Sequence, residues 1–212
     1  MLKEIGEVMK EAYDRNWITT RDGNCAVRFR DKIFMTPSGV KKNNIMSDHL
    51  ISLTLKSPGV LFNLHDGLSP TGEWEMHYRI LESSEEELST LHLHPPHIVA
   101  AMHAGWELMD LVSPFPEVYR YTKVGKNVDS YPALSKELAL ETFENISKED
   151  TLHFDLVGQK SHGVCAVGKN PWHAFEHIER VEHIAKVVLL SGVNPPLKPE
   201  NKKSKKIFSF LA

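Results

Sequence analysis

The sequence predicts an α/β protein, a three-layer α/β/α sandwich on a mainly antiparallel mixed sheet. Short strand-like segments occur in consecutive pairs, which indicates hairpins, and amphipathic helical segments lie between them. The strict strand–helix alternation of a doubly wound parallel sheet is missing, and so are GxGxxG and Walker sequences. The 212 residues suffice for one such domain, which we assign to residues 1–194, followed by a C-terminal tail at residues 195–212.

The N-terminal half provides a first helix and several strands. Apolar residues between positions 2 and 13 recur on one helical face. Residues 23–39 alternate between apolar and polar as a hairpin does, and residues 49–55 form a further strand. Residues 67–84 are interpreted as a loop that leads into a helix, and the segment LHLH at residues 91–94 forms the next strand.

The C-terminal half continues with helices and strands in irregular order. Asn170 is suited to cap a long last helix, with Pro171 at its first position, since an asparagine oxygen accepts from the free N–H groups there. The other predicted segments are a helix at 98–109, a loop at 113–132 with a short strand at 117–122, a helix at 133–146, and strands at 151–158 and 162–168.

Composition and charge exclude several classes of protein. A net charge of −3 and a pI near 6.5 give no reason to expect a nucleic acid as partner. The apolar runs are too short for a membrane span, and the N-terminal segment lacks the apolar centre of a signal peptide. We therefore expect a cytoplasmic protein without a membrane partner. Cys25 and Cys165 are too few for a disulfide scaffold and are expected to be buried and reduced.

The segment TLHLHPPH, Thr90–His97, carries the strongest functional signal. Side chains two residues apart on a strand share a face, so His92 and His94 lie side by side, and the two prolines end the strand. His162 opens a later strand. Three imidazoles from strand ends are the usual protein part of an open zinc site. The alternative interpretation is that each histidine satisfies a local hydrogen bond.

Other segments carry groups with a functional and a plain interpretation. Glu73 falls in the first turn of a predicted helix, where a carboxylate also suits simple capping. Residues 35–40, MTPSGV, form a turn with two hydroxyl groups and free backbone N–H groups, which suits an anion or a plain turn. HAFEH at 173–177 matches an inverted zincin pattern, but the apolar stripe of its helix favours packing over a protease site.

The order of these segments resembles the class II aldolase/adducin family. The segments GN, TPSG, GEW, HLHPPH and SHGVCAVG carry the resemblance, which extends from about Gly23 to Leu190. It implies a three-layer fold and a homotetramer with active sites at subunit boundaries. It also implies a metal-dependent aldolase that cleaves a phosphorylated ketose to dihydroxyacetone phosphate and an aldehyde, or a closely related pentulose-phosphate epimerase.

The resemblance also implies a role for individual residues. His92, His94 and His162 fall on the family's metal-binding histidines, which we expect to hold one zinc ion per chain. Glu73 falls on the catalytic carboxylate, which can also ligate the free metal and which shuttles a proton on the enediolate left by cleavage. The positions that fall on the phosphate-binding residues are Asn24, Ser38, Gly39, Thr71 and Gly72.

This chain also departs from the family pattern. The family often has a serine two residues after Asn24 and two serines before Glu73, where this chain has alanine and Thr71–Gly72, so two hydroxyl groups are missing. Two other readings of the family stay open. A methylthioribulose-1-phosphate dehydratase-like enzyme would use a later glutamate such as Glu107 or Glu117, and an adducin-like interaction domain would not be catalytic.

The C-terminal tail has a composition of its own. Five lysines lie between Lys198 and Lys206, and they are followed by the apolar residues Ile207, Phe208, Phe210 and Leu211. An apolar end is better buried against a neighbouring subunit than exposed to water, and a frayed terminus is the alternative.

Overall fold

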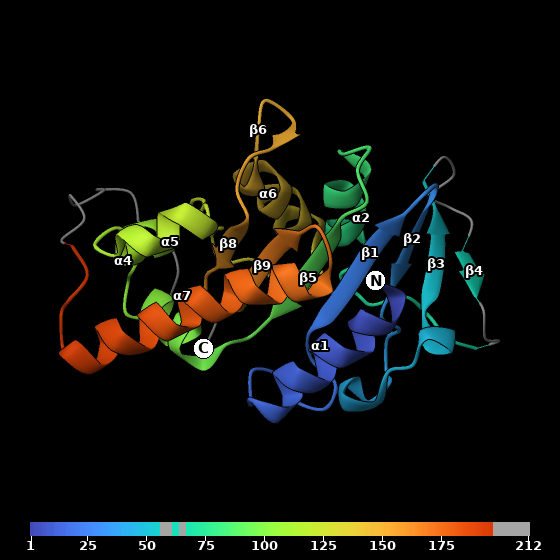
Figure 1. Cartoon of the computed structure of the whole chain (residues 1–212), viewed down its shortest axis with the longest axis horizontal. Coiled ribbons are helices and arrows are strands. Elements are labelled where there is room, and N and C mark those ends of the chain that lie inside the picture. Colours follow the sequence, from blue (N-terminus) through green and yellow to red (C-terminus); the bar gives the residue numbers. More distant parts are fainter. Residues whose placement is uncertain (56–60, 64–66, 197–212) are drawn as a thin grey trace, which may run out of the picture.

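The computed structural model describes residues 1–55, 61–63 and 67–196, with residues 61–63 described as backbone only. The strands of the main sheet are β1 (Asn24–Phe29), β2 (Lys32–Met35), β3 (Ile51–Thr54), β4 (Leu61–Asn63), β5 (Ser89–Leu93), β8 (Leu156–Gln159) and β9 (Gly163–Gly168). Their order is β4-β3-β2-β1-β5-β9-β8, and every neighbouring pair is antiparallel (Figure 1). Isolated parallel bridges from Val124 to Leu156 and from Val128 to Gln159 add the mixed character that the sequence predicted.

Helices cover both faces of this sheet. They are α1 (Leu2–Asp14), α2 (Trp74–Glu82), α3 (Pro96–His103), α4 (Leu108–Val112), α5 (Pro116–Tyr121), α6 (Lys136–Ile146) and α7 (Pro171–Ser191). One hydrophobic core joins α1, α3 and α7 to one face, and two smaller clusters join α2 and α6 to the other (Figure 1). The predicted three-layer sandwich is confirmed.

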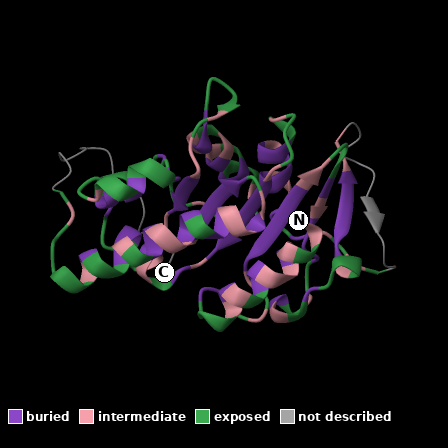
Figure 2. Cartoon of the chain, in the orientation of Figure 1, coloured by how far each residue is buried: buried purple, intermediate pink, exposed green. Residues whose placement is uncertain are grey.

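The alternation of side chains along β5 connects the core to the site. Leu91 and Leu93 pack into the core beneath α1 and α7. Thr90 and His92 therefore point to the opposite face, toward α2, although they too are buried. β5 and β9 are buried along their length, whereas β1 is less buried at its last two residues, as Figure 2 shows. Because successive side chains of a strand point to opposite faces, β5 anchors the core with its two leucines and presents His92 to the layer that contains α2.

The start of α7 and the burial of the two cysteines are as the sequence predicted. The side chain of Asn170 accepts a hydrogen bond from the backbone N–H of His173, and Pro171 is the first helical residue. Cys25 and Cys165 are buried and unpaired. None of the described helices is long and apolar enough to cross a membrane.

The predicted short strand at 117–122 is wrong, because residues 117–121 belong to α5 and Thr122 is the residue that caps its end. Pro116 occupies the first turn of this helix, where its fixed φ angle and missing N–H are both tolerated. The tyrosines and Val118 suggested a strand, yet only Val118 is buried, while Tyr119 and Tyr121 are about half exposed (50% and 53%). A single buried residue per turn suits a short surface helix.

Two further predicted elements are interrupted. The helix at 98–109 is two helices, because α3 ends before Gly105, whose φ of 102° cannot continue a right-handed helix. The strand at 151–158 is also divided. Residues Thr151–Leu152 (β7) pair with Ser147–Lys148 (β6) in a separate two-stranded sheet, and the main sheet resumes at Leu156. Between them the carboxylate of Asp155 accepts a hydrogen bond from the backbone N–H of Lys123 at 2.7 Å, which turns the chain.

Candidate metal centre and active site

Three histidines converge where β5 and β9 meet. His92 is fully buried on β5, His94 follows the last residue of that strand, and His162 directly precedes β9. The Nε2 atoms of His92 and His94 are 2.9 Å apart, and one nitrogen from each of the three histidines lies within 4.8 Å of the others. Within residues 1–55, 61–63 and 67–196, this is the group of side chains with metal-ligand geometry.

The donor set of this cluster fits a divalent metal ion. Nδ1 of His92 is 2.9 Å from the carbonyl oxygen of Val164, which can only accept, so Nδ1 carries the hydrogen and Nε2 presents its lone pair. A lone pair that faces another imidazole nitrogen at 2.9 Å is suited to a cation between the two. Burial lowers the pKa of both His92 and His94, and the neutral imidazole is the form that ligates a metal.

Glu73 lies at the edge of this cluster, at the N-cap position of α2. Its Oε2 is 3.3 Å from Nε2 of His92, and its Oε1 is 3.7 Å from Nε2 of His162. Oε2 accepts a hydrogen bond of 2.8 Å from the side-chain amide of Asn24, whereas Oε1 is buried without a hydrogen-bond partner. The carboxylate makes no capping bond to α2. Its geometry therefore suits a metal ligand or a proton carrier better than a helix cap.

A cavity of about 280 Å³ opens beside Glu73, His94 and His162. The five positions expected to bind phosphate all line it: Asn24, Ser38, Gly39, Thr71 and Gly72. Two segments far apart in sequence meet here, since the backbone N–H of Ser38 donates to Ser69 and that of Thr71 donates to Thr36. The expectation of free N–H groups in the turn at 35–40 is therefore wrong for Ser38, and the N–H of Thr71 is used as well; both residues can offer their hydroxyl groups instead.

Comparison with known proteins identifies the family of this chain. The family model for the class II aldolase and adducin N-terminal domain matches residues 3–189. The chain belongs to this family. It is 29% identical over 189 residues to an L-fuculose phosphate aldolase of Methanocaldococcus jannaschii, a match that covers 89% of this chain and 96% of the relative. A solved L-fuculose 1-phosphate aldolase shares the fold with a TM-score of 0.74 at 20% identity, over 94% of this chain and 90% of the other.

Proteins named methylthioribulose-1-phosphate dehydratase match only a part of this chain. A probable methylthioribulose-1-phosphate dehydratase of Acyrthosiphon pisum is 33% identical over 57 residues, which is 27% of this chain and 25% of the relative. Neither of the glutamates that a dehydratase-like enzyme would use, Glu107 and Glu117, lines the histidine cavity. Glu107 accepts from the backbone N–H of Asn127 at 3.1 Å and lies 3.5 Å from Nζ of Lys160.

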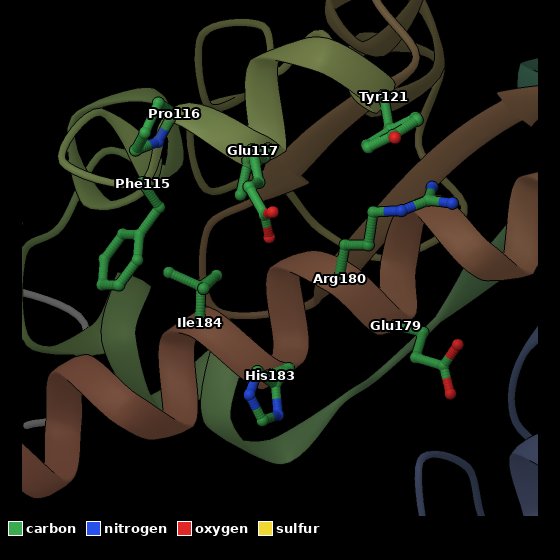
Figure 3. A pocket seen from close by; sticks show the side chains of 9 residues that line it. Phe115, Pro116, Glu117, Tyr121, Glu179, Arg180, His183 and Ile184 are labelled. Carbon is green, nitrogen blue, oxygen red and sulfur yellow. The ribbon is translucent and has the colours of Figure 1, made fainter.

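Glu117 lines a different cavity, of about 500 Å³, between α5 and α7 (Figure 3). Its carboxylate points into this space, opposite Ile184, while Arg180 stacks against Tyr121. The cavity is larger than the one beside the histidines, but its charged groups do not converge on a common point. Cavity size alone would therefore single out a place that the three histidines do not line.

Two cations that line the histidine cavity, Arg21 and Lys42, were not predicted from the sequence. The Arg21 guanidinium donates to the carbonyl oxygen of Gly39, and Nζ of Lys42 donates to that of Pro37 at 2.6 Å. Lys42 is only 2% exposed, and burial lowers its pKa to about 8 despite the nearby carboxylate of Asp22. Both residues flank motifs that were recognised, but the sequence does not show which lysine of the pair Lys41–Lys42 is buried.

Gly163 is the first residue of β9 and lies against the rings of His92 and His94. A Cβ atom at this position would lie 2.4 Å from the carbonyl oxygen of Leu93 and 2.6 Å from Cδ2 of His94. It would also lie 3.1 Å from Cε1 of His92. Glycine is therefore required here by close approach, because any side chain would push the strand or the rings apart.

The HAFEH segment of α7 has no role in this site. Nδ1 of the buried His177 is 2.8 Å from Oγ1 of Thr122, and Glu176 pairs with Arg180 at 3.0 Å. Nδ1 of His177 and the carboxylate of Glu176 thus have structural partners, in agreement with the packing interpretation, although Nε2 of His177 is buried without one.

Proposed function

We propose that this member of the class II aldolase family is a cytoplasmic, zinc-dependent lyase that cleaves a phosphorylated ketose to dihydroxyacetone phosphate and an aldehyde. The observation that carries the proposal is one cavity lined by His94, His162, a buried carboxylate and a polar cradle, with His92 directly behind His94 in the same three-histidine cluster. The curated relatives named L-fuculose phosphate aldolase, aligned over most of the chain, support the same reaction class.

Different residues would hold the metal, bind the phosphate and transfer the proton. A divalent metal held by His92, His94 and His162 would supply a Lewis acid for the negative charge that develops on the ketone half. The cradle around Ser38 and Thr71 holds the phosphate and so fixes the reacting carbon. As the C3–C4 bond breaks, a base takes the proton of the C4 hydroxyl group, the bonding electrons remain on the ketone half, and Glu73 delivers a proton to C3.

The deciding experiment is a screen of phosphorylated ketoses for cleavage, with metal analysis of the same sample. We expect formation of dihydroxyacetone phosphate and about one zinc per chain. Unphosphorylated ketoses serve as the control and should react poorly. Interconversion of two pentulose phosphates without cleavage would instead favour the epimerase reading. Loss of water from methylthioribulose 1-phosphate would favour the dehydratase. A folded, metal-free and inactive protein would favour an adducin-like interaction domain.

Lys42 provides a test of the anion cradle that is independent of turnover. We expect Lys42→Met to weaken binding of inorganic phosphate by about 10- to 100-fold, since a charge-assisted hydrogen bond is lost. In the unaltered protein, affinity should also fall as pH rises above about 8, because the free protein loses the Lys42 proton there and phosphate binding must restore it. Calorimetry measures both effects, and the exposed Lys41→Met is the matched control. Equal phosphate affinity in the two variants would contradict this role.

We further propose a homotetramer, with the C-terminal tail packed against a neighbouring subunit. Residues 197–212, including the apolar end at 207–211, lie outside the described residues. Light scattering of the purified protein at micromolar concentration should give the mass of four chains, and removal of residues 196–212 should weaken the assembly. A monomer would contradict the first expectation, and an intact tetramer with full activity after truncation would contradict the second.

A further inference from the structure

Three buried side chains form a chain of hydrogen bonds behind Glu73. Oγ1 of Thr90 is 2.6 Å from Nδ1 of His77, Nε2 of His77 is 2.5 Å from Oδ1 of Asn24, and Nδ2 of Asn24 is 2.8 Å from Oε2 of Glu73. His77 has an exposure of 0%, and Thr90 and Asn24 are buried as well. His77 belongs to none of the motifs that indicated the site, whereas Thr90 is the first residue of the segment TLHLHPPH.

The direction of each hydrogen bond in this chain follows from the bond between Asn24 and Glu73. A carboxylate oxygen can only accept, so the amide of Asn24 presents its N–H to Glu73 and its oxygen to His77. Nε2 of His77 must then carry a hydrogen and donate it to Asn24. Nδ1 is left as the acceptor for the hydroxyl of Thr90. Burial lowers the pKa of His77 to about 4, which agrees with the neutral ring that this arrangement requires.

The chain fixes the carboxylate from three elements at once. Asn24 begins β1, Thr90 lies on β5, and His77 lies one helical turn after Glu73 in α2. The strands are locked by their register, in which Asn24 pairs with His92 and Ala26 with Thr90. Glu73 is thereby held through Oε2 alone, and Oε1 is left buried without a partner, 3.7 Å from His162.

We propose that His77 is a positioning residue that acts through Asn24 to hold the carboxylate of Glu73 in one orientation, with Oε1 as the oxygen that carries the proton. The proposal rests on the lyase function proposed above. The proposal also changes the expected role of Asn24. Its side-chain oxygen accepts from His77 and one amide N–H donates to Glu73, so only the other N–H can donate to a phosphate.

Kinetics of the zinc-loaded enzyme test this role. His77→Leu is expected to lower kcat by about 10- to 100-fold, while the KM for the ketose phosphate and the zinc content change much less, because the hydrogen bonds of His77 go to Thr90 and Asn24 and to none of the three histidines. His77→Gln restores an N–H donor toward Asn24 and should recover most of kcat. His177→Leu is the matched control, since His177 is equally buried and also bonded to a threonine, Thr122. Equal loss of kcat in both leucine variants, or an unchanged kcat in His77→Leu, would overturn the proposal.

A second variant and crystal structures test the same role of His77 in other ways. If His77→Leu does not fold, Thr90→Val removes the first donor with little change in shape, and it should lower kcat by a smaller factor without a change in KM. Crystal structures of zinc-loaded protein provide a readout without turnover: Glu73 should occupy one orientation in the unaltered protein and more than one in the variant. A single orientation in both would overturn the proposal. Failure of every ketose phosphate to react would overturn the lyase function, while the orientation of Glu73 would still be decided.

Discussion

Replacement of His92 with alanine is expected to remove the bound metal and lower activity by more than about 100-fold. Substitution of groups that only contact a ligand costs about 10- to 100-fold, and loss of the buried central ligand should cost more. His92 contributes most to the cluster because it lies within contact distance of both His94 and Glu73. Zinc per chain and turnover are measured on the same preparation.

The exposed His103→Ala is a suitable control for this experiment, because it also removes one imidazole but lies outside the cluster. The metal should also stabilise the fold by mass action, by about 4 kcal/mol at a concentration of 1,000 times Kd. Addition of a chelator should therefore lower the Tm of the unaltered protein and leave that of His92→Ala unchanged. Full zinc content in His92→Ala would contradict the assignment of the ligands.

Glu73→Gln is expected to separate metal binding from catalysis. Glutamine keeps the size of the side chain and an oxygen for the amide of Asn24, so zinc content and KM should change little. It cannot carry the proton, and kcat should fall by about 10²- to 10⁴-fold. Glu75→Gln is the matched control, since Glu75 lies on the same helix but pairs with Arg79 at 2.6 Å. Undiminished turnover in Glu73→Gln would remove Glu73 from the mechanism.

The parts of the site that follow local periodicity could be predicted from the sequence. The H-x-H spacing and the two prolines define a strand end with two imidazoles on one face, and this information lies within eight residues, Thr90–His97. The third histidine and the order of the motifs required the family pattern. The layers of the fold followed in the same way from alternating and helical apolar residues.

The remaining parts depend on contacts between distant segments, which a local pattern does not contain. His77 reaches Asn24 only because α2 packs over β1, and Lys42 is buried only because its loop folds against Pro37. The N–H groups of Ser38 and Thr71 are used up by each other's neighbouring segments. The apolar periodicity at 98–109 continues past Gly105, but the positive φ of this glycine cannot be part of a right-handed helix. Periodicity alone therefore predicted a helix that is too long.

Gly163 has a consequence for how relatives of this chain diverge. All three histidines can be kept in a sequence while a single methyl group at position 163 forces the His92 and His94 rings and the strand apart. Such a descendant would retain every residue of the metal motif and yet lose the metal. An enzyme could thereby become a scaffold in one mutational step, and a search that counts only ligands would still classify it as a catalyst. The residue at 163 is the one to inspect before a reaction is assigned to any relative that carries the histidines.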